Sequence, residues 1–483
     1  MARMGAPDTL DENEDHRGDA AGRVVPYSEG HRTGLRHLKF MPPSRLRLPF
    51  PPFPPSAGLT VGLALVLGVT TPEISAAAPE LLNDRARLQS VTSRNLEDIS
   101  PDAPLQLPRS AAARSYPAPK LERVALSLHG NSVRMNQLPE FTSTFAGKVA
   151  GITLRDEYVF YSLDPELQQF VQNLLRQVRA PHAAIVAMEP DTGKILAIAD
   201  KSNSGRDLSL HTGFPAASIF KIVTTAAALE RQAVVPESLI RFRGGTYTLN
   251  KWNYAPNPKT DRRVMAVQEA LAKSCNPVFA RIALKHLNPG LLKHYARLFG
   301  FNTPLHFDST LPMSAAHIPS TDFELSRTAA GFGQVTLSPV HAAAMMAGLA
   351  HDGNLPRPSL VERVISRHGD VLYQARPAVL HRLVQPRTAR TLMSMMEYTT
   401  TIGTSRREFM RKNRPVLPGI RVAAKTGTLS GTNPKGVNNW FVAAAPIDNP
   451  RIALSVIVVN PSSIDTKASH LGRLVIQRYL SGS

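Results

Sequence analysis

Three short polar motifs occur in this sequence in an order and at spacings that fit a single catalytic site. They are Ser218-Ile219-Phe220-Lys221, Ser274-Cys275-Asn276 and Lys425-Thr426-Gly427-Thr428. A Ser-x-x-Lys motif by itself is expected about once by chance in a chain of this length, and a Lys-Thr-Gly triplet alone says little. The three together predict an active site built around a serine that becomes acylated.

Ser218 is the expected nucleophile of this site. It opens an apolar stretch that continues to residue 229, and Lys221 lies one helical turn further on the same face. A lysine can take the serine proton only where burial or a neighbouring cation keeps the lysine neutral. A helix N-terminus also directs backbone N–H groups at developing negative charge. The alternative interpretation is a simple helix cap beside a surface lysine.

The second motif interrupts a helical stretch just before Pro277, so we predict a turn between two helices that points into a cleft. Ser274 could relay a proton between the lysine and the leaving group, and Asn276 could hold a substrate amide. Cys275 has no nearby histidine and is interpreted as a packed small residue. Ordinary loop polarity is the alternative for this motif.

The third motif follows a short apolar run, residues 422–424, which suits a strand that lines a cleft. Gly427 would let substrate approach the backbone closely, and Thr426 and Thr428 offer hydroxyl groups to a carboxylate. Lys425 supplies positive charge that would lower the pKa of the lysine in the first motif. The alternative is a strand end that carries a solvated lysine.

The elements that must position these motifs are strands at both ends of the folded region and helices between them. Residues 164–178 have the 3.6-residue period of an amphipathic helix. Two hairpins are predicted, at residues 183–199 and 440–459, and further helices are predicted at residues 219–231, 266–286, 339–350 and 465–480. This pattern predicts one antiparallel sheet assembled from both ends of the region and covered by helices.

Composition excludes several other classes of protein. The net charge is +19, but no dense basic run is interleaved with aromatic residues in the last two-thirds of the chain, so we expect no nucleic-acid partner. Cys275 is the single cysteine, which rules out a disulfide within the chain, and no Cys/His cluster has metal-ligand spacing. A hydrophobic core must therefore stabilise the fold.

The N-terminal part of the chain has the sequence features of a targeting segment followed by a linker. We predict a disordered acidic tail in residues 1–30, and a basic flank with a signal peptide or membrane anchor in residues 31–79. Translation could start at Met1 or at Met41. Residues 80–150 are expected to form a linker or small N-terminal segment, with a strand near residues 145–153. The catalytic domain is expected to span residues 151–483.

With these residues in view, residues 158–480 resemble the transpeptidase domain of penicillin-binding proteins. Further stretches similar to that family are residues 163–168, 189–197, 331–334, 337–339, 418–419 and 440–442. The resemblance implies an α/β (α+β) fold with an antiparallel five-stranded sheet covered by helices on both faces, and a mostly irregular N-terminal region. It implies neither a metal nor another cofactor.

The resemblance also implies a chemical part for each motif. Ser218 is similar to the family's acylated nucleophile and Lys221 to its general base, with Ser274 and Asn276 assisting. The terminal carboxylate of the substrate would be held by Lys425, Thr426 and Thr428, and the N–H groups of Ser218 and Thr428 would form the oxyanion hole. The implied enzyme is a peptidoglycan D,D-transpeptidase that is acylated by D-Ala-D-Ala stem peptides and cross-links the cell wall. β-Lactams would acylate the same serine.

The segment at residues 79–150 is too short for a glycosyltransferase domain, so the resemblance implies a monofunctional enzyme. Such an enzyme would act in the periplasm or cell envelope. Its partners would include proteins such as a separate glycosyltransferase. A D,D-carboxypeptidase or a serine β-lactamase of the same fold is the alternative, and a non-catalytic penicillin-binding sensor or scaffold is the alternative of another class. A β-lactamase needs a group that activates the deacylating water, and neither Glu230 nor Glu237 lies in a context that we can tie to that task.

Overall fold

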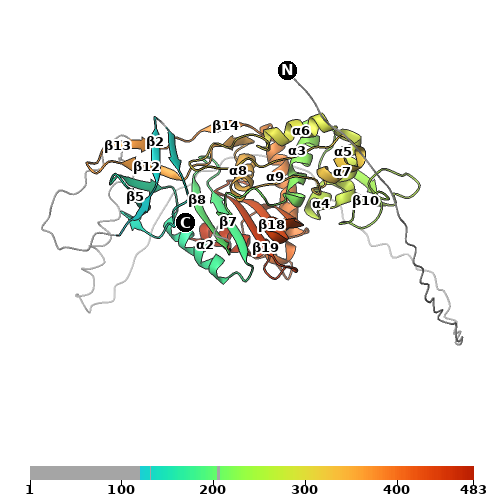
Figure 1. Cartoon of the computed structure of the whole chain (residues 1–483). Coiled ribbons are helices and arrows are strands. Elements are labelled where there is room, and N and C mark those ends of the chain that lie inside the picture. Colours follow the sequence, from blue (N-terminus) through green and yellow to red (C-terminus); the bar gives the residue numbers. More distant parts are fainter. Residues whose placement is uncertain (1–119, 131, 204–206, 483) are drawn as a thin grey trace, which may run out of the picture. The chain divides into compact units, whose positions relative to one another are not determined.

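The computed structural model describes residues 120–482, except 131 and 204–206 (Figure 1). The chain divides into two units, Met1–Arg94 and Asn95–Ser483, and every described residue belongs to the second. The predictions for the acidic tail, the basic flank with its signal or anchor, and most of residues 80–150 lie outside the described residues. Within the described residues no helix combines the length and apolar character needed to cross a membrane.

The centre of the fold is a five-stranded sheet in which every neighbouring pair is antiparallel. Figure 1 shows its C-terminal strands in red beside strands in green from much earlier in the chain. In spatial order the strands are β17 (Ala423–Thr432), β18 (Lys435–Ala445), β19 (Ile452–Asn460), β7 (His182–Met188) and β8 (Ile195–Ser202). The predicted antiparallel sheet, with strands from both ends of the region, is confirmed.

Both faces of this sheet are covered, so its strands are apolar on both sides. All nine residues of β19 are buried. Leu454 and Val456 pack into the core on one face, whereas Ala453 and Ile457 pack into the core on the other. Successive side chains of a strand point to opposite faces, and therefore a continuous apolar run fits a strand with helices on both sides.

On one face lie α2 (Pro165–Gln177) and α11 (Ala468–Ser481), which bury Val171, Leu175 and Val475. Helix α2 begins where the sequence predicted: the Asp164 side chain accepts a hydrogen bond of 2.8 Å from the Leu167 N–H, which satisfies one of the free donors of the first turn.

The other face is covered by α8 (Pro339–Ala350), which packs on β19, β7 and β18. Beside it lie the helices that carry or support the three motifs. They are α3 (Lys221–Glu230), α4 (Val267–Ala272), α5 (Asn276–His286) and α9 (Pro386–Thr401). Helix α9 also contacts β17 and α4, so it joins the edge strand of the sheet to the helical part of the site.

The remaining elements are short. The helices are the 3-10 helix η1 (Ala217–Phe220), α6 (Pro289–Leu298), α7 (Asp322–Ala329) and α10 (Arg406–Phe409). Three small antiparallel pairs are β9 (Leu239–Phe242) with β10 (Arg263–Ala266), β11 (Asn354–Pro356) with β14 (Val379–Arg382), and β15 (Met410–Arg411) with β16 (Arg414–Pro415).

The described residues before α2 form strands and join a second sheet. This sheet contains β1 (Glu122–Val124), β4 (Thr144–Phe145), β5 (Lys148–Thr153), β6 (Tyr158–Tyr161), β12 (Val361–Ile365) and β13 (Val371–Gln374). A separate pair is β2 (Leu126–His129) with β3 (Ser132–Met135). Residues near 145–153 do form a strand, and the domain boundary that we expected at residue 151 falls inside β5.

Candidate active site

Ser218 lies in η1, directly before α3, and follows a tight backbone turn. The residue before it, Ala217, has a φ of 49°, a left-handed conformation that alanine rarely adopts. The indole N–H of Trp440 donates a hydrogen bond of 2.9 Å to the carbonyl oxygen of Pro215. Ser218 was expected to open the α-helix itself, but the α-helix begins only at Lys221 because the tighter 3-10 turn comes first.

Lys221 is fully buried and its Nζ atom lies 2.8 Å from Ser218 Oγ. The same nitrogen lies 2.7 Å from Asn276 Oδ1 and also contacts the carbonyl oxygen of Ala330. Neither of those two oxygens carries a proton, so they take up two N–H bonds of the amine. A neutral Lys221 therefore keeps its lone pair for the Ser218 hydroxyl.

Burial moves the pKa of Lys221 well below its usual range, and the nearby charge of Lys425 lowers the pKa further. Burial lowers the pKa of Lys425 itself to about 7. Two buried ammonium groups in one site disfavour each other's charge, so the charge of Lys425 adds to burial in favouring the neutral form of Lys221. The environment thus provides the neutral amine that general-base catalysis by Lys221 requires.

The second motif forms the turn between α4 and α5, as predicted. Ser274 has a φ of 56° and its Oγ accepts a hydrogen bond of 3.1 Å from Lys425 Nζ. Asn276 is the first residue of α5, and its Nδ2 donates a hydrogen bond of 2.6 Å to the carbonyl oxygen of Tyr247. Asn276 Oδ1 thus contacts Lys221 Nζ, whereas the second N–H of its Nδ2 is not used by these contacts and Asn276 lines the cavity. The expected contact of Asn276 with a substrate amide stays a prediction.

Cys275 is fully buried, and burial raises the pKa of its thiol to about 11. A thiol with so high a pKa carries almost no thiolate at neutral pH and is a poor nucleophile. The interpretation of Cys275 as a packed small residue is confirmed.

The third motif lies on β17, the edge strand of the central sheet, next to η1. Lys425 is fully buried behind Ser274, and its Nζ also donates a hydrogen bond of 2.8 Å to the carbonyl oxygen of Thr426. A Cβ at Gly427 would lie 3.3 Å from the carbonyl oxygen of Ala216. The missing side chain at this position therefore lets β17 approach the serine turn. The expected approach of substrate to the Gly427 backbone stays a prediction.

A cavity of about 220 Å³ joins the three motifs. It is lined by Ser218, Ser274, Asn276, Thr426 and Thr428 and, outside the motifs, by Tyr247, Ala330, Gly331, Phe332, Thr404 and Leu429. Lys221 and Lys425 lie behind this lining. Tyr247 and Thr404 could not be recognised as cavity residues from the sequence, because neither belongs to a motif of catalytic residue types. In the described part of the chain, no cluster of His, Cys, Asp or Glu could hold a metal ion.

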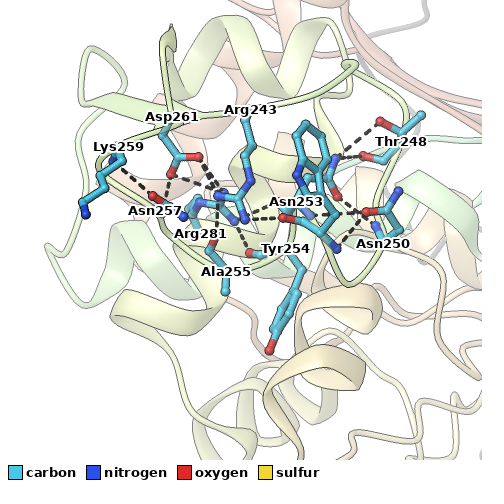
Figure 2. Close-up of polar contacts among 11 residues, drawn as sticks. Arg243, Thr248, Asn250, Asn253, Tyr254, Ala255, Asn257, Lys259, Asp261 and Arg281 are labelled. Carbon is cyan, nitrogen blue, oxygen red and sulfur yellow. Dashed lines mark hydrogen bonds and ion pairs between the residues drawn. The ribbon is translucent and has the colours of Figure 1, made fainter.

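The loop that carries Tyr247 is fixed to α5 by a buried ion cluster (Figure 2). Asp261 Oδ1 lies 2.9 Å from Arg243 Nη1 and 3.3 Å from Arg281 Nη2, and these side chains are between 4% and 11% exposed. Arg281, on the same helix as Asn276, also donates to the carbonyl oxygens of Asn253 and Tyr254. The cluster thus holds one wall of the cavity against the helix that orients Lys221.

Replacing Asp261 by asparagine is expected to lower the free energy of unfolding by about 3–5 kcal/mol, because two buried guanidinium groups would lose their counter-charge. Urea denaturation of the purified protein measures this change. The matched control is Glu324→Gln, since Glu324 forms an exposed pair with Arg327 at 3.4 Å, and its loss should cost less than about 1 kcal/mol. Equal and small losses in both variants would contradict a stabilising function of the cluster.

Comparisons with known proteins agree with this geometry. Residues 183–475 match the family described as penicillin binding protein transpeptidase domain. The peptidoglycan D,D-transpeptidase PbpA of Mycobacterium tuberculosis H37Rv is 29% identical over 373 residues, which are 66% of this chain and 72% of the relative. PbpA of Mycolicibacterium smegmatis is 28% identical over 385 residues, which are 71% of this chain and 74% of the relative.

Among solved structures, the imipenem acyl-enzyme complex of penicillin-binding protein A from M. tuberculosis is similar to this fold. Its TM-score is 0.54 at 25% identity, and the match covers 69% of this chain and 80% of that one. A protein of similar fold therefore forms an acyl-enzyme with the β-lactam imipenem.

Proposed function

Because this chain belongs to the family of penicillin-binding protein transpeptidase domains, we propose that it is a peptidoglycan D,D-transpeptidase with Ser218 as its nucleophile. One observation carries the proposal: a fully buried lysine, Lys221, lies 2.8 Å from a serine hydroxyl that lines a cavity. The substrate proposed is a stem peptide that ends in D-Ala-D-Ala, as the resemblance of the three motifs implies, and two relatives are named peptidoglycan D,D-transpeptidases.

In the acylation step, neutral Lys221 takes the proton of Ser218 while Oγ attacks the carbonyl carbon of the penultimate D-Ala. The backbone N–H groups of Ser218 and Thr428 stabilise the developing oxyanion. The proposed oxyanion hole needs Ser218 and Thr428 to lie close together, and η1, which carries Ser218, contacts β17, the strand that carries Thr428. The C–N bond then breaks, and the leaving D-Ala amine receives its proton from the Lys221 ammonium through Ser274. An acceptor amine then attacks the ester carbonyl carbon, Lys221 takes the amine proton and passes it to Ser218 Oγ as the C–O bond breaks, and the cross-linked product leaves.

The third motif holds the free carboxylate of the leaving D-Ala. Thr426 and Thr428 line the cavity and offer the direct hydrogen bonds. Lys425 acts from behind them: it is fully buried and donates to Ser274 Oγ, so its charge attracts the carboxylate without a direct contact. The same charge keeps Lys221 neutral.

The absence of a carboxylate from the cavity favours a transpeptidase over a β-lactamase. None of the described residues that line the cavity is Asp or Glu. Glu237 is exposed, and Glu230 accepts a hydrogen bond of 3.1 Å from the Gln385 N–H. Without a carboxylate beside the ester, water is activated poorly and the acyl-enzyme survives until an amine arrives.

The decisive experiment is mass spectrometry of the purified protein with a D-Ala-D-Ala peptide, with and without an acceptor amine. We expect release of one D-Ala, an acyl-peptide on Ser218, and a cross-linked product when the amine is present. Hydrolysis alone in both samples would indicate a D,D-carboxypeptidase. Fast repeated turnover of nitrocefin would indicate a β-lactamase, and no acylation at all would indicate a sensor or scaffold.

We further propose that residues 151–483 act as the catalytic domain at the cell envelope, and that residues 31–79 direct export and either anchor the protein or are cleaved. The basic flank and apolar run of that segment support this location. We propose a separate glycosyltransferase as the partner that supplies uncross-linked strands.

A further inference from the structure

The hydroxyl group of Thr404 touches the third motif inside the cavity. Thr404 Oγ1 lies 2.6 Å from Thr426 Oγ1, and both residues line the cavity that contains Ser218. In the described part of the chain, Thr404 is the one side chain that forms a hydrogen bond with the Thr426 hydroxyl. Thr404 therefore extends the row of hydroxyl groups at the end of the cavity where Thr426 and Thr428 lie.

The backbone holds Thr404 in this place. Its N–H donates a hydrogen bond of 3.1 Å to the carbonyl oxygen of Ala272, at the end of α4 and two residues before Ser274. The residue before it is Gly403, where a Cβ would lie 2.3 Å from that same oxygen. The Ser405 N–H donates a bond of 3.0 Å back to Thr399 O in α9. The loop is thus clamped between two helices, and Thr404 is fixed relative to β17 and the Ser274 turn.

The direction of the Thr404–Thr426 hydrogen bond matters because each hydroxyl has a single proton. Without ligand, either group can be the donor. When Thr426 donates its proton to a carboxylate, it has none left for Thr404. Thr404 must then donate to Thr426. The result is a chain of two hydrogen bonds that ends on the ligand, and each bond strengthens the next by polarisation.

We propose that Thr404 is a positioning residue, which donates its proton to Thr426 and fixes the Thr426 hydroxyl toward the carboxylate of the bound ligand. Thr404 thereby sets the preference of the site for ligands with a free carboxylate. This inference rests on the proposed function, in which Thr426 binds the carboxylate that leaves with D-Ala.

The test compares acylation by benzylpenicillin with acylation by its methyl ester, which lacks the charged carboxylate. We expect Thr404→Val to reduce the second-order rate of acylation by benzylpenicillin about 10-fold, the scale of one lost hydrogen bond that acts on a charged group. The rate with the ester should change less than about twofold. Thr404→Ser keeps the hydroxyl and should retain the wild-type rate with both ligands.

A double-mutant cycle separates positioning from simple support of the fold. In a Thr426→Val background, Thr404→Val should have no further effect, because the hydroxyl on which it acts is gone. The control is Thr401→Val, whose hydroxyl bonds the Glu397 carbonyl oxygen in α9 at 3.4 Å and does not line the cavity. We expect wild-type rates and an unchanged melting temperature for this control.

An equal loss with benzylpenicillin and its ester would overturn the inference alone, and so would effects of the two threonines that multiply independently in the double variant. A wild-type rate in Thr404→Val would do the same. If wild-type protein is not acylated by benzylpenicillin at all, the proposed function fails and the inference fails with it, and this outcome is recognised before any variant is made.

Discussion

Replacing Ser218 by alanine is expected to abolish covalent labelling by a fluorescent penicillin, a loss on the order of 10⁴-fold or more. The reason is that Ser218 Oγ is the hydroxyl next to the buried amine of Lys221, at 2.8 Å. Cys275 cannot replace it, because the thiol is fully buried and its pKa is raised to about 11. Gel fluorescence and the intact mass of the protein after incubation measure the label.

The matched control for this variant is Ser430→Ala, since Ser430 is an exposed serine on β17, the strand of the third motif. Labelling of this control should equal that of the wild type. A melting temperature close to the wild-type value in both variants would show that the loss is chemical. Persistent labelling of Ser218→Ala would mean that another residue is the nucleophile, and the mechanism proposed above would be wrong.

The second large effect concerns the charge of Lys425. In the wild type, the rate of acylation should rise with pH as Lys221 loses its proton, and should fall again as Lys425 loses its proton above a pKa of about 7. Replacing Lys425 by methionine removes the positive charge beside Lys221 and so raises the pKa of Lys221. We expect the rising limb of the profile to move to higher pH and the falling limb to disappear.

At pH 7 the rate of acylation in Lys425→Met should be lower by about 100-fold or more, since less Lys221 is neutral and the carboxylate loses an attracting charge. Stopped-flow labelling between pH 5 and pH 9 would give the profile. Lys435→Met is the control, because Lys435 is an exposed lysine on the neighbouring strand β18. An unshifted profile and undiminished labelling in Lys425→Met would remove Lys425 from the mechanism.

Regular periodicity made the sheet and several helices predictable from sequence. The 3.6-residue period of residues 164–178 gave α2 within one residue at each end. The apolar runs of β18 and β19 gave the C-terminal hairpin, because strands buried on both faces are continuously apolar.

Features that depend on distant pairing could not be predicted in this way. Strands β1 and β5 pair in parallel through three residues each, and β6 pairs with β12 from a region far along the chain. Segments this short have no detectable period of their own, so residues 80–150 read as a linker. The same reason explains the missed contact of Thr404 with Thr426, which depends on how α9 lies against β17.

The motifs predicted which residues form the site but not the contacts that hold those residues in place. The order of Ser218, Ser274 and Lys425 along the chain predicted a common site, and the structure brings them around one cavity and its lining. The contact of Gly427 with the serine turn could not be read from the sequence, because a glycine can admit either substrate or a neighbouring part of the fold.

The strand order of the central sheet determines when during synthesis the site can first exist. Strand β7 pairs with β8, the next strand in the chain, and with β19, which begins only at Ile452. A nascent chain that ends before Ile452 already contains Ser218 and Lys221 but lacks the central strand, and β7 is left with an open edge. Ser218 is therefore synthesised well before the sheet that completes its site can form. Until β19 is synthesised, the exposed edge of β7 makes the unfinished chain prone to aggregation.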